Sequence, residues 1–97
     1  MADTTEVIHA PERQRYEILV DGQPVGFVRY RPVEPGVSDF LHTEVDPAFE
    51  GRGLGSVLAE GALDDVRARG GRVVPTCPFI ADYLKRHTEY ADLVFTG

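Results

Sequence analysis

The chain has 97 residues, of which 42% are hydrophobic and 27% charged, and its formal net charge is −6. This length suits one domain with a single core, and the acidic balance argues against a general nucleic-acid binder, which needs a basic field. The single cysteine excludes an internal disulfide, and no apolar run approaches the roughly 20 residues that cross a bilayer. We therefore expect one cytoplasmic domain over residues 1–97, with a loose terminus at 1–4 and no metal, nucleic-acid or membrane partner.

The first half of the chain has the period-two pattern of β-strands. Four strands are expected there, at residues 7–10, 15–20, 24–30 and 37–45. Asp21-Gly22 is a tight hairpin signal between the second and the third strand. Two prolines and a glycine within residues 31–36 predict another turn, since neither residue type suits a strand interior. This half is therefore predicted to form an antiparallel meander.

Strict alternation along these strands predicts which side chains share a face of the sheet. In the third strand it groups Val25 with Phe27. In the fourth strand it groups Phe40 with His42 and Glu44, and it leaves open which face of that strand looks into a cleft.

The second half changes to the period of a helix. Apolar residues recur there at helical spacing, at Leu54, Val57, Leu58, Ala62, Leu63 and Val66. Gly70-Gly71 gives the stop signal of this helix, and residues 72–76 are short and β-branched, which predicts a buried strand. Pro78 is well placed to open a second helix that ends near His87, and an irregular tail is expected at residues 88–97. The fold class is thus α/β (α+β), an antiparallel meander followed by a β-α-β crossover and a short C-terminal helix.

The segment between the two halves carries three glycines at alternate positions, Gly51, Gly53 and Gly55. They permit a tight turn in which several N–H groups converge. A helix that begins near Gly53 adds unpaired N–H groups and the positive end of its dipole. A phosphate is the expected occupant, and the alternative is an ordinary glycine-rich connection. A Walker loop is disfavoured because no lysine follows the glycines.

Residues 37–83 resemble the core of the GNAT acyltransferase superfamily, whose phosphate loop is written Gln/Arg-x-x-Gly-x-Gly/Ala. The matching segment is Glu50-Gly51-Arg52-Gly53-Leu54-Gly55. Two further segments resemble a minimal, single-domain branch of that superfamily, His42-Thr43-Glu44-Val45 and Pro75-Thr76-Cys77-Pro78-Phe79. Glu50 departs from the pattern because an acidic side chain cannot donate to a phosphate, so Arg52 or the backbone must carry that contact.

The resemblance implies acetyl-CoA or coenzyme A as cofactor and an amine, on a small molecule or a protein, as acceptor. In this family the loop amides hold the pyrophosphate, and the edge of the preceding strand pairs with the pantetheine arm. The implied cofactor contacts are Thr43, Glu44, Val45, Gly51, Arg52, Gly53, Leu54, Gly55, Ser56, Cys77, Pro78 and Arg86.

Cys77 ends a short strand and precedes a proline-initiated helix, a position where the helix dipole favours a thiolate. In GNAT topology this strand splays away from its parallel neighbour, which would bring Cys77 near the acyl carbon. Three roles stay open. Cys77 attacks the thioester and becomes acylated, it protonates the leaving thiolate while the amine attacks directly, or it is a small buried residue that lines the pocket.

His42 and Glu44 are the candidates for the base that deprotonates the amine, and histidine, with an ordinary pKa of about 6.5, suits that task better. The alternatives are a packing role for His42 and a turn-anchoring role for Glu44. Tyr83 is similar to the general-acid tyrosine of many GNAT enzymes, although its spacing after Cys77 is shifted by about one residue.

The predicted function is acetyl-CoA-dependent N-acetyl transfer by a monomer or weak homodimer. The acidic surface would suit a cationic acceptor such as lysine or a polyamine. The alternatives are a module that binds coenzyme A or acyl-CoA without turnover and an interaction domain whose glycine loop is purely structural.

Overall fold

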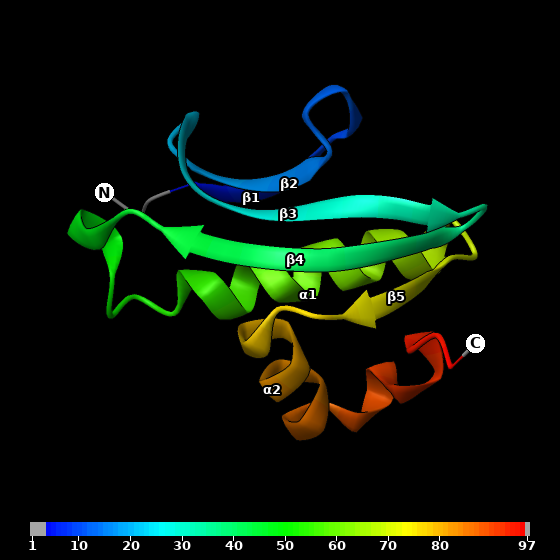
Figure 1. The fold of residues 1–97 in the computed structure, drawn as a ribbon. Helices are drawn as coiled ribbons and strands as arrows, with labels where there is room; N and C mark the ends of the chain where they lie inside the picture. Colours follow the sequence, from blue (N-terminus) through cyan, green and yellow to red (C-terminus); the bar gives the residue numbers. More distant parts are fainter. Residues whose placement is uncertain (1–3, 97) are drawn as a thin grey trace.

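The computed structural model describes residues 4–96 and contains a five-stranded sheet with the order β1-β2-β3-β4-β5 (Figure 1). The strands are β1 (Thr5–Ala10), β2 (Arg15–Val20), β3 (Gln23–Glu34), β4 (Val37–Val45) and β5 (Arg72–Pro75). The helices are α1 (Leu54–Ala68) and α2 (Pro78–Arg86), with 3-10 turns at Pro11–Arg13, Pro47–Phe49 and Thr88–Leu93. Strands β1 to β4 are antiparallel and β5 is parallel to β4, so the predicted fold class is confirmed.

Helix α1 crosses from β4 to β5 and buries one apolar stripe against the sheet. Its buried residues are Leu54, Leu58, Ala59, Ala62, Leu63 and Val66. The helix ends at the predicted glycines: Gly70 has φ 71° and donates to the Arg67 carbonyl, and Gly71 donates to the Val66 carbonyl. These two bonds satisfy carbonyls that a helix end leaves unpaired.

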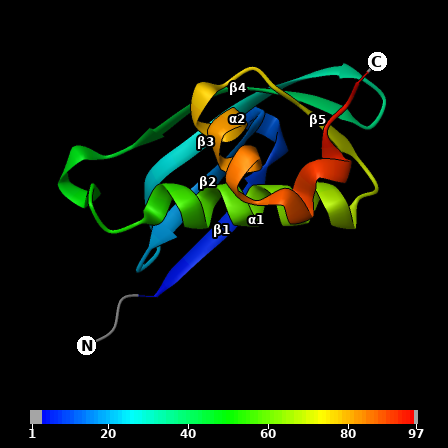
Figure 2. The same ribbon diagram turned by 90° about the horizontal axis from the view of Figure 1, so that it is seen from below.

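Both helices lie on the same side of the sheet, and the other face carries no helix (Figure 2). The buried cluster on the helix side joins α1 and α2 to the sheet through fully buried residues such as Phe40, Leu58 and Ile80. A fully buried side chain of this size stabilises the fold by roughly 1.5–3 kcal/mol. We call the opposite, helix-free side the outer face of the sheet.

An extra residue in β3 changes the predicted grouping of Val25 and Phe27. Ile18 pairs with Gly26 and Leu19 pairs with Pro24, so Val25 has no partner in β2. Such a bulge turns the following side chains to the opposite face. Val25 is therefore buried, while Phe27 lies on the outer face, and the prediction that they share a face is wrong.

A second extra residue, Leu41, interrupts β4. Arg29 pairs with His42 but the next residue of β3, Tyr30, pairs with Phe40. Phe40 is fully buried against the helices, whereas His42 and Glu44 are exposed on the outer face. The prediction that Phe40 shares a face with His42 and Glu44 is wrong for Phe40.

The turn predicted over residues 31–36 is shorter than expected. Strand β3 continues through Pro32 to Glu34, which leaves Pro35 and Gly36 as the turn. Pro32 is tolerated because β2 begins opposite Arg29, so no second neighbouring strand requires its missing N–H. The turn prediction for residues 31–34 is therefore wrong.

The two ends of the described chain are held by hydrogen bonds. Most of the predicted loose terminus lies outside the described residues, but Thr4 is not loose, because its N–H and C=O both bond to Asp21. At the other end a 3-10 helix replaces the first part of the predicted irregular tail, and the Phe95 N–H donates to the Val73 carbonyl at 2.8 Å. Tyr90 and Leu93 of this segment are buried in the core. Residue 97 of that tail lies outside the described part.

Candidate active site

The glycine loop leads from the end of β4 to the first turn of α1. Asp46 accepts the Ala48 N–H at 2.9 Å and so starts the 3-10 turn that follows β4. Gly51 and Gly53 have φ of 82° and 72°, in the left-handed region that other residues rarely adopt. The loop conformation therefore depends on glycine at both positions.

The N–H groups of this loop point to an anion site. Within residues 4–96, the N–H groups of Gly51 and of residues 53–56 have no acceptor in the protein, and the bonds of α1 begin with Val57 donating to Gly53. Unpaired donors at the positive end of a helix dipole form a ready site for a phosphate. The same loop lines a hollow of about 260 Å³ together with Val45, Phe49 and Phe79.

Phe79 belongs to the second segment that resembles the family, where it was not assigned to the site, and in the structure it lines this hollow. A Cβ atom on Gly55 would lie 2.9 Å from the end of the Phe79 ring, closer than carbon atoms normally approach. Glycine at position 55 thus lets α2 bring an aromatic ring over the loop. In the structure, the 36% exposure of this large apolar side chain indicates that Phe79 belongs to the site. A single phenylalanine in the sequence gives no such indication.

Strands β4 and β5 separate beside the loop. Their pairing ends at Phe40 and Pro75, after which the Cys77 N–H still donates to the Phe40 carbonyl at 2.8 Å. Strand β4 continues to Val45 with no strand on that side among the described residues. A gap therefore opens between the strands, and one edge of β4 remains available for pairing.

The backbone direction along β4 decides which residues face this open edge. The Asp46 N–H donates to the Val25 carbonyl of β3 at 2.7 Å. Because backbone groups alternate along a strand, those of Thr43 and Val45 face away from β3 and towards the open edge, and those of Glu44 face β3. The contact of Thr43 and Val45 with a pantetheine arm stays a prediction, and their backbone geometry is suited to it.

Cys77 lies where the gap begins, directly before α2. Its side chain is buried, with 3% of the residue exposed, and its Sγ is 3.3 Å from the Thr43 Oγ1. The two side chains belong to the helix side of the sheet. The structure thus brings two of the predicted site residues, Cys77 and Thr43, into contact.

His42 and Glu44 lie on the other side of β4. The His42 Nε2 is 3.4 Å from a Glu44 carboxylate oxygen, and the side chains are 54% and 60% exposed. They project to the same face, as predicted, but that face is the outer one, so the strand itself lies between them and Cys77.

Tyr83 and Pro78 both belong to α2. Pro78 is its exposed first residue. Tyr83 is buried and stacks on His87, with ring centroids 3.9 Å apart. Burial, followed by the charge of Glu60, raises the pKa of Tyr83, so its hydroxyl stays protonated at neutral pH, which a general acid requires.

The two arginines predicted to bind the cofactor do not line the 260 Å³ hollow. The Arg52 guanidinium lies 5.1 Å from the Phe49 ring centroid and borders a different hollow, beside Asp21. Arg86 pairs with Asp82 on the surface of α2 at 3.2 Å. The donors that do line this hollow are the backbone N–H groups of the loop.

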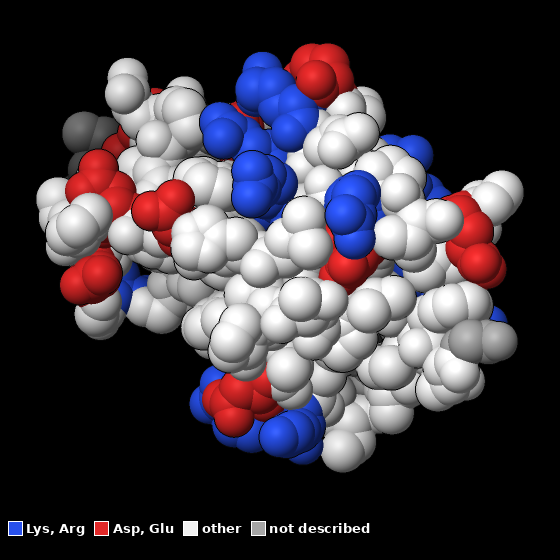
Figure 3. All heavy atoms as spheres, viewed as in Figure 1, with Lys and Arg blue, Asp and Glu red and all other residues white. Residues whose placement is uncertain are grey.

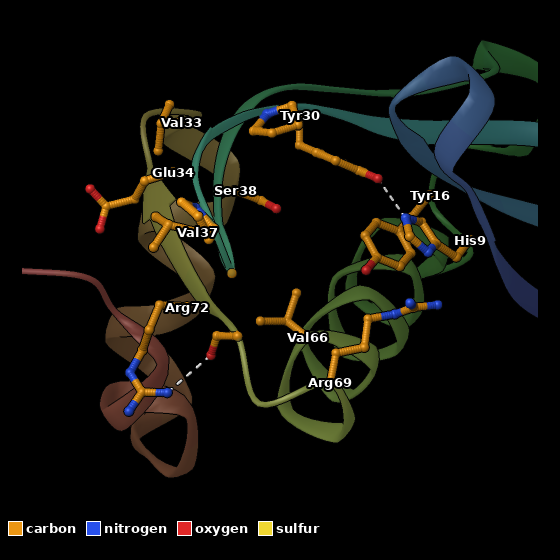
Figure 4. Close-up of a pocket in the computed structure, with 14 residues that line it drawn as sticks. His9, Tyr16, Tyr30, Val33, Glu34, Val37, Ser38, Val66, Arg69 and Arg72 are labelled. Atoms are coloured by element: carbon orange, nitrogen blue, oxygen red, sulfur yellow. Dashed lines mark hydrogen bonds between the residues drawn. The ribbon is translucent and has the colours of Figure 1, made fainter.

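A second hollow, of about 430 Å³, lies at the other end of α1 and contains none of the predicted site residues (Figure 4). His9 stacks on Tyr16 at 4.4 Å and its Nε2 is 2.5 Å from the Tyr30 hydroxyl. Asp65 accepts hydrogen bonds of 2.6 Å from the Tyr16 hydroxyl and from Arg69 Nε. The sequence could not reveal this cluster, because its members come from three strands and a helix.

Neither a metal centre nor a membrane-spanning helix is present in the part of the chain that the structure describes. No cluster there of three or more His, Cys, Asp or Glu residues could hold a metal ion. No helix in residues 4–96 has the length and apolarity that crossing a membrane requires.

Comparisons with known proteins point to one family. Residues 15–93 match the family model of the GCN5-related N-acetyl-transferases. Protein NATD1 of Mus musculus is 32% identical over 82 residues, which are 84% of this chain and 74% of that protein, and NATD1 of Gallus gallus is 31% identical over 83 residues, 84% and 76% of the two chains. The solution structure of a GCN5-like protein from Staphylococcus aureus has the same fold, with a TM-score of 0.70 and 20% identity over 93% of this chain and 87% of that one. The resemblance seen in the sequence is thus confirmed, and the chain belongs to the GCN5-related N-acetyltransferase family.

Proposed function

We propose that this protein is an acetyl-CoA-dependent N-acetyltransferase that transfers an acetyl group to an amine. The observation that carries the proposal is the set of loop N–H groups, at Gly51 and residues 53–56, that have no acceptor within residues 4–96. They lie beside the open edge of β4 and the gap that begins at Cys77. Membership of the family supports the same activity.

The chain offers a separate set of donors for each part of coenzyme A. The loop N–H groups would hold the pyrophosphate, which explains how a protein of net charge −6 binds a polyanion. The backbone of Thr43 and Val45 would pair with the amides of the pantetheine arm, as an added strand pairs with a sheet edge. This orientation directs the thioester into the gap between β4 and β5, which begins beside Cys77.

The side chains around the gap can then handle the protons of the reaction. Acetyl-CoA supplies an activated acetyl group, whose C–S bond breaks as the new N–C bond forms. His42 takes the proton of the amine, and Glu44 at 3.4 Å stabilises the imidazolium that results. Cys77 or Tyr83 returns a proton to the leaving sulfur, unless Cys77 itself first accepts the acetyl group.

Calorimetry with coenzyme A, followed by an assay of thiol release from acetyl-CoA with a panel of amines, tests the proposal. We expect saturable binding at micromolar protein and amine-dependent release. Absence of binding contradicts any coenzyme A function and favours a purely structural loop. Binding without release for every amine identifies a non-catalytic coenzyme A module instead.

The role of Cys77 is tested separately with Cys77→Ala and Cys77→Ser. Intact-mass measurement of the wild type after acetyl-CoA treatment detects an acetyl group on the protein. Loss of activity in both variants together with that mass supports the covalent route. Full activity in Cys77→Ala excludes it and leaves direct attack by the amine.

A further inference from the structure

The inference that follows rests on the proposed function and concerns the acceptor. We propose that the acceptor binds on the outer face of the sheet and that Arg29 selects small amines that carry a carboxylate, such as ω-amino acids. The net charge of −6 favours cationic acceptors, but the outer face of the sheet also carries arginine side chains.

The packing of the helices leaves one side from which an acceptor can reach the gap between β4 and β5. On the helix side, Phe40, Val73 and Ile80 are fully buried under α1 and α2. An acceptor on that side would have to displace the core. The outer face is covered by no helix (Figures 1 and 2), and it carries His42 and Glu44, the two candidates for the base.

The register of the strands puts Arg29 next to these candidates. Arg29 pairs with His42 of β4 on one side and with Arg15 of β2 on the other. Phe27 likewise pairs with Glu44. Adjacent strands are about 4.8 Å apart. The Arg29 position on β3 is therefore one strand spacing away from the His42 position on β4, where the amine would bind. Figure 3 shows basic side chains gathered over this part of the sheet.

Arg29 differs from the other arginines of this face in having no carboxylate partner. Arg13 and Arg15 both bond to the buried Glu17 carboxylate, at 2.9 Å and 2.7 Å. Arg31 lies 3.5 Å from Asp39. The Arg29 side chain is exposed and makes no ion pair or hydrogen bond with any residue in 4–96. Its positive charge is therefore available to a ligand.

These positions fit a molecule with a positive and a negative group a few bonds apart. Glu44 attracts an ammonium group beside His42, and Arg29 attracts a carboxylate about one strand spacing away. The Phe27 ring lies edge-on to the His42 ring, with centroids 6.3 Å apart, and beneath the Arg15 guanidinium, which is 4.6 Å from its centroid. The part of the ring beside His42 would contact the methylene groups between the charges. A simple polyamine would leave Arg29 facing another cation.

Matched pairs of amines test the inference: β-alanine against propylamine, and γ-aminobutyrate against butylamine, in the thiol-release assay. We expect kcat/KM to be at least about tenfold higher for the carboxylate of each pair, since a charge-assisted bond to Arg29 is made by that member alone. Arg29→Gln should remove this preference by raising KM for the two carboxylates while their kcat stays the same, so that the members of each pair react with similar kcat/KM. Arg31→Gln is the control, because Arg31 lies on the same strand but is paired, and it should keep the preference.

The outcomes separate the inference from the proposed function. Equal rates for the two members of each pair in the wild type overturn the role of Arg29 but leave the acetyltransferase in place. A preference that survives in Arg29→Gln also overturns it. Calorimetric titration of γ-aminobutyrate into the protein saturated with coenzyme A gives a readout without turnover. Saturable binding that is lost in Arg29→Gln supports the acceptor site even if no amine is acetylated, and absence of binding contradicts it.

Discussion

The polar groups at the two ends of α1 differ in whether they have hydrogen-bond partners. At the C-terminal end, Asp65 accepts hydrogen bonds from Tyr16 and Arg69. His9 there contacts the Tyr30 hydroxyl (Figure 4). At the N-terminal end, the N–H groups of residues 53–56 have no acceptor within residues 4–96 and border an open hollow. Polar groups that are paired stabilise a fold, whereas oriented donors left unpaired are suited to a ligand. One end of the helix therefore contributes to stability, and the other end is the one that we propose binds the cofactor.

The largest effect is expected from Asp65→Ala at the C-terminal end. It removes the acceptor of the Tyr16 hydroxyl and the partner of Arg69, and we expect the free energy of unfolding to fall by about 2 kcal/mol, the typical value for bonds to a charged group. Urea unfolding measures this change. Affinity for coenzyme A should stay at the wild-type value. A tenfold loss of affinity with unchanged stability would contradict the assignment of the C-terminal end to stability.

Gly55→Ala at the N-terminal end should have the reverse effect. The added methyl meets the Phe79 ring at 2.9 Å and moves it across the hollow. We expect the Kd for coenzyme A to rise at least about tenfold, or 1.4 kcal/mol. Stability should change little, because alanine is the better helix former. Binding should recover in the double variant Gly55→Ala, Phe79→Ala, which has no ring to displace.

Gly53→Ala should affect both the stability of the fold and the affinity for coenzyme A. Gly53 has φ 72° with open space around its Cβ position, so alanine would be strained there by roughly 1 kcal/mol without any clash. Both stability and coenzyme A affinity should fall. Gly36→Ala is the matched control, since Gly36 has φ 79° in an equally open turn, between β3 and β4 at the end of β4 opposite the glycine loop. It should lower stability by a similar amount and leave binding unchanged.

The sequence predicted those elements whose signals are local. The helical period of α1, its terminal glycines and the proline at the start of α2 each act within a few residues, and all three predictions agree with the structure. The bulges at Val25 and Leu41 could not be predicted, because neither residue is a glycine or proline and the extra residue is defined only by the partner strand.

The features of the candidate site also divide into those with a local sequence signal and those that depend on distant segments. Three glycines in six residues predicted an anion-binding loop, and Gly51 and Gly53 have the positive φ that such a loop uses. The contact of Phe79 with Gly55 and the pairing of Arg29 with His42 join segments far apart in the sequence. They depend on how α2 docks and on strand register, which no local pattern encodes.

The smallest effect we expect is a pH dependence at the C-terminal end of α1. Burial, and then the charge of Arg69, lowers the pKa of His9 below its ordinary 6.5. Between that lowered pKa and pH 6.5 the unfolded chain binds a proton that the folded protein does not, so the free energy of unfolding falls as the pH drops from 7 towards 5. His9→Phe keeps a ring on Tyr16 but does not titrate.

Urea unfolding of both proteins at a series of pH values measures the difference. The variant should lose less stability than the wild type between pH 7 and pH 5. Asp65 does not obscure the result: burial acts to raise the pKa of its carboxyl, but the bonds from Tyr16 and Arg69 outweigh burial and lower it below 3.8. Its contribution is lost only at more acidic pH. Parallel curves for the two proteins would mean that the folded protein accommodates a charged His9, with the buried Nδ1 then donating to Asp65, 3.7 Å away.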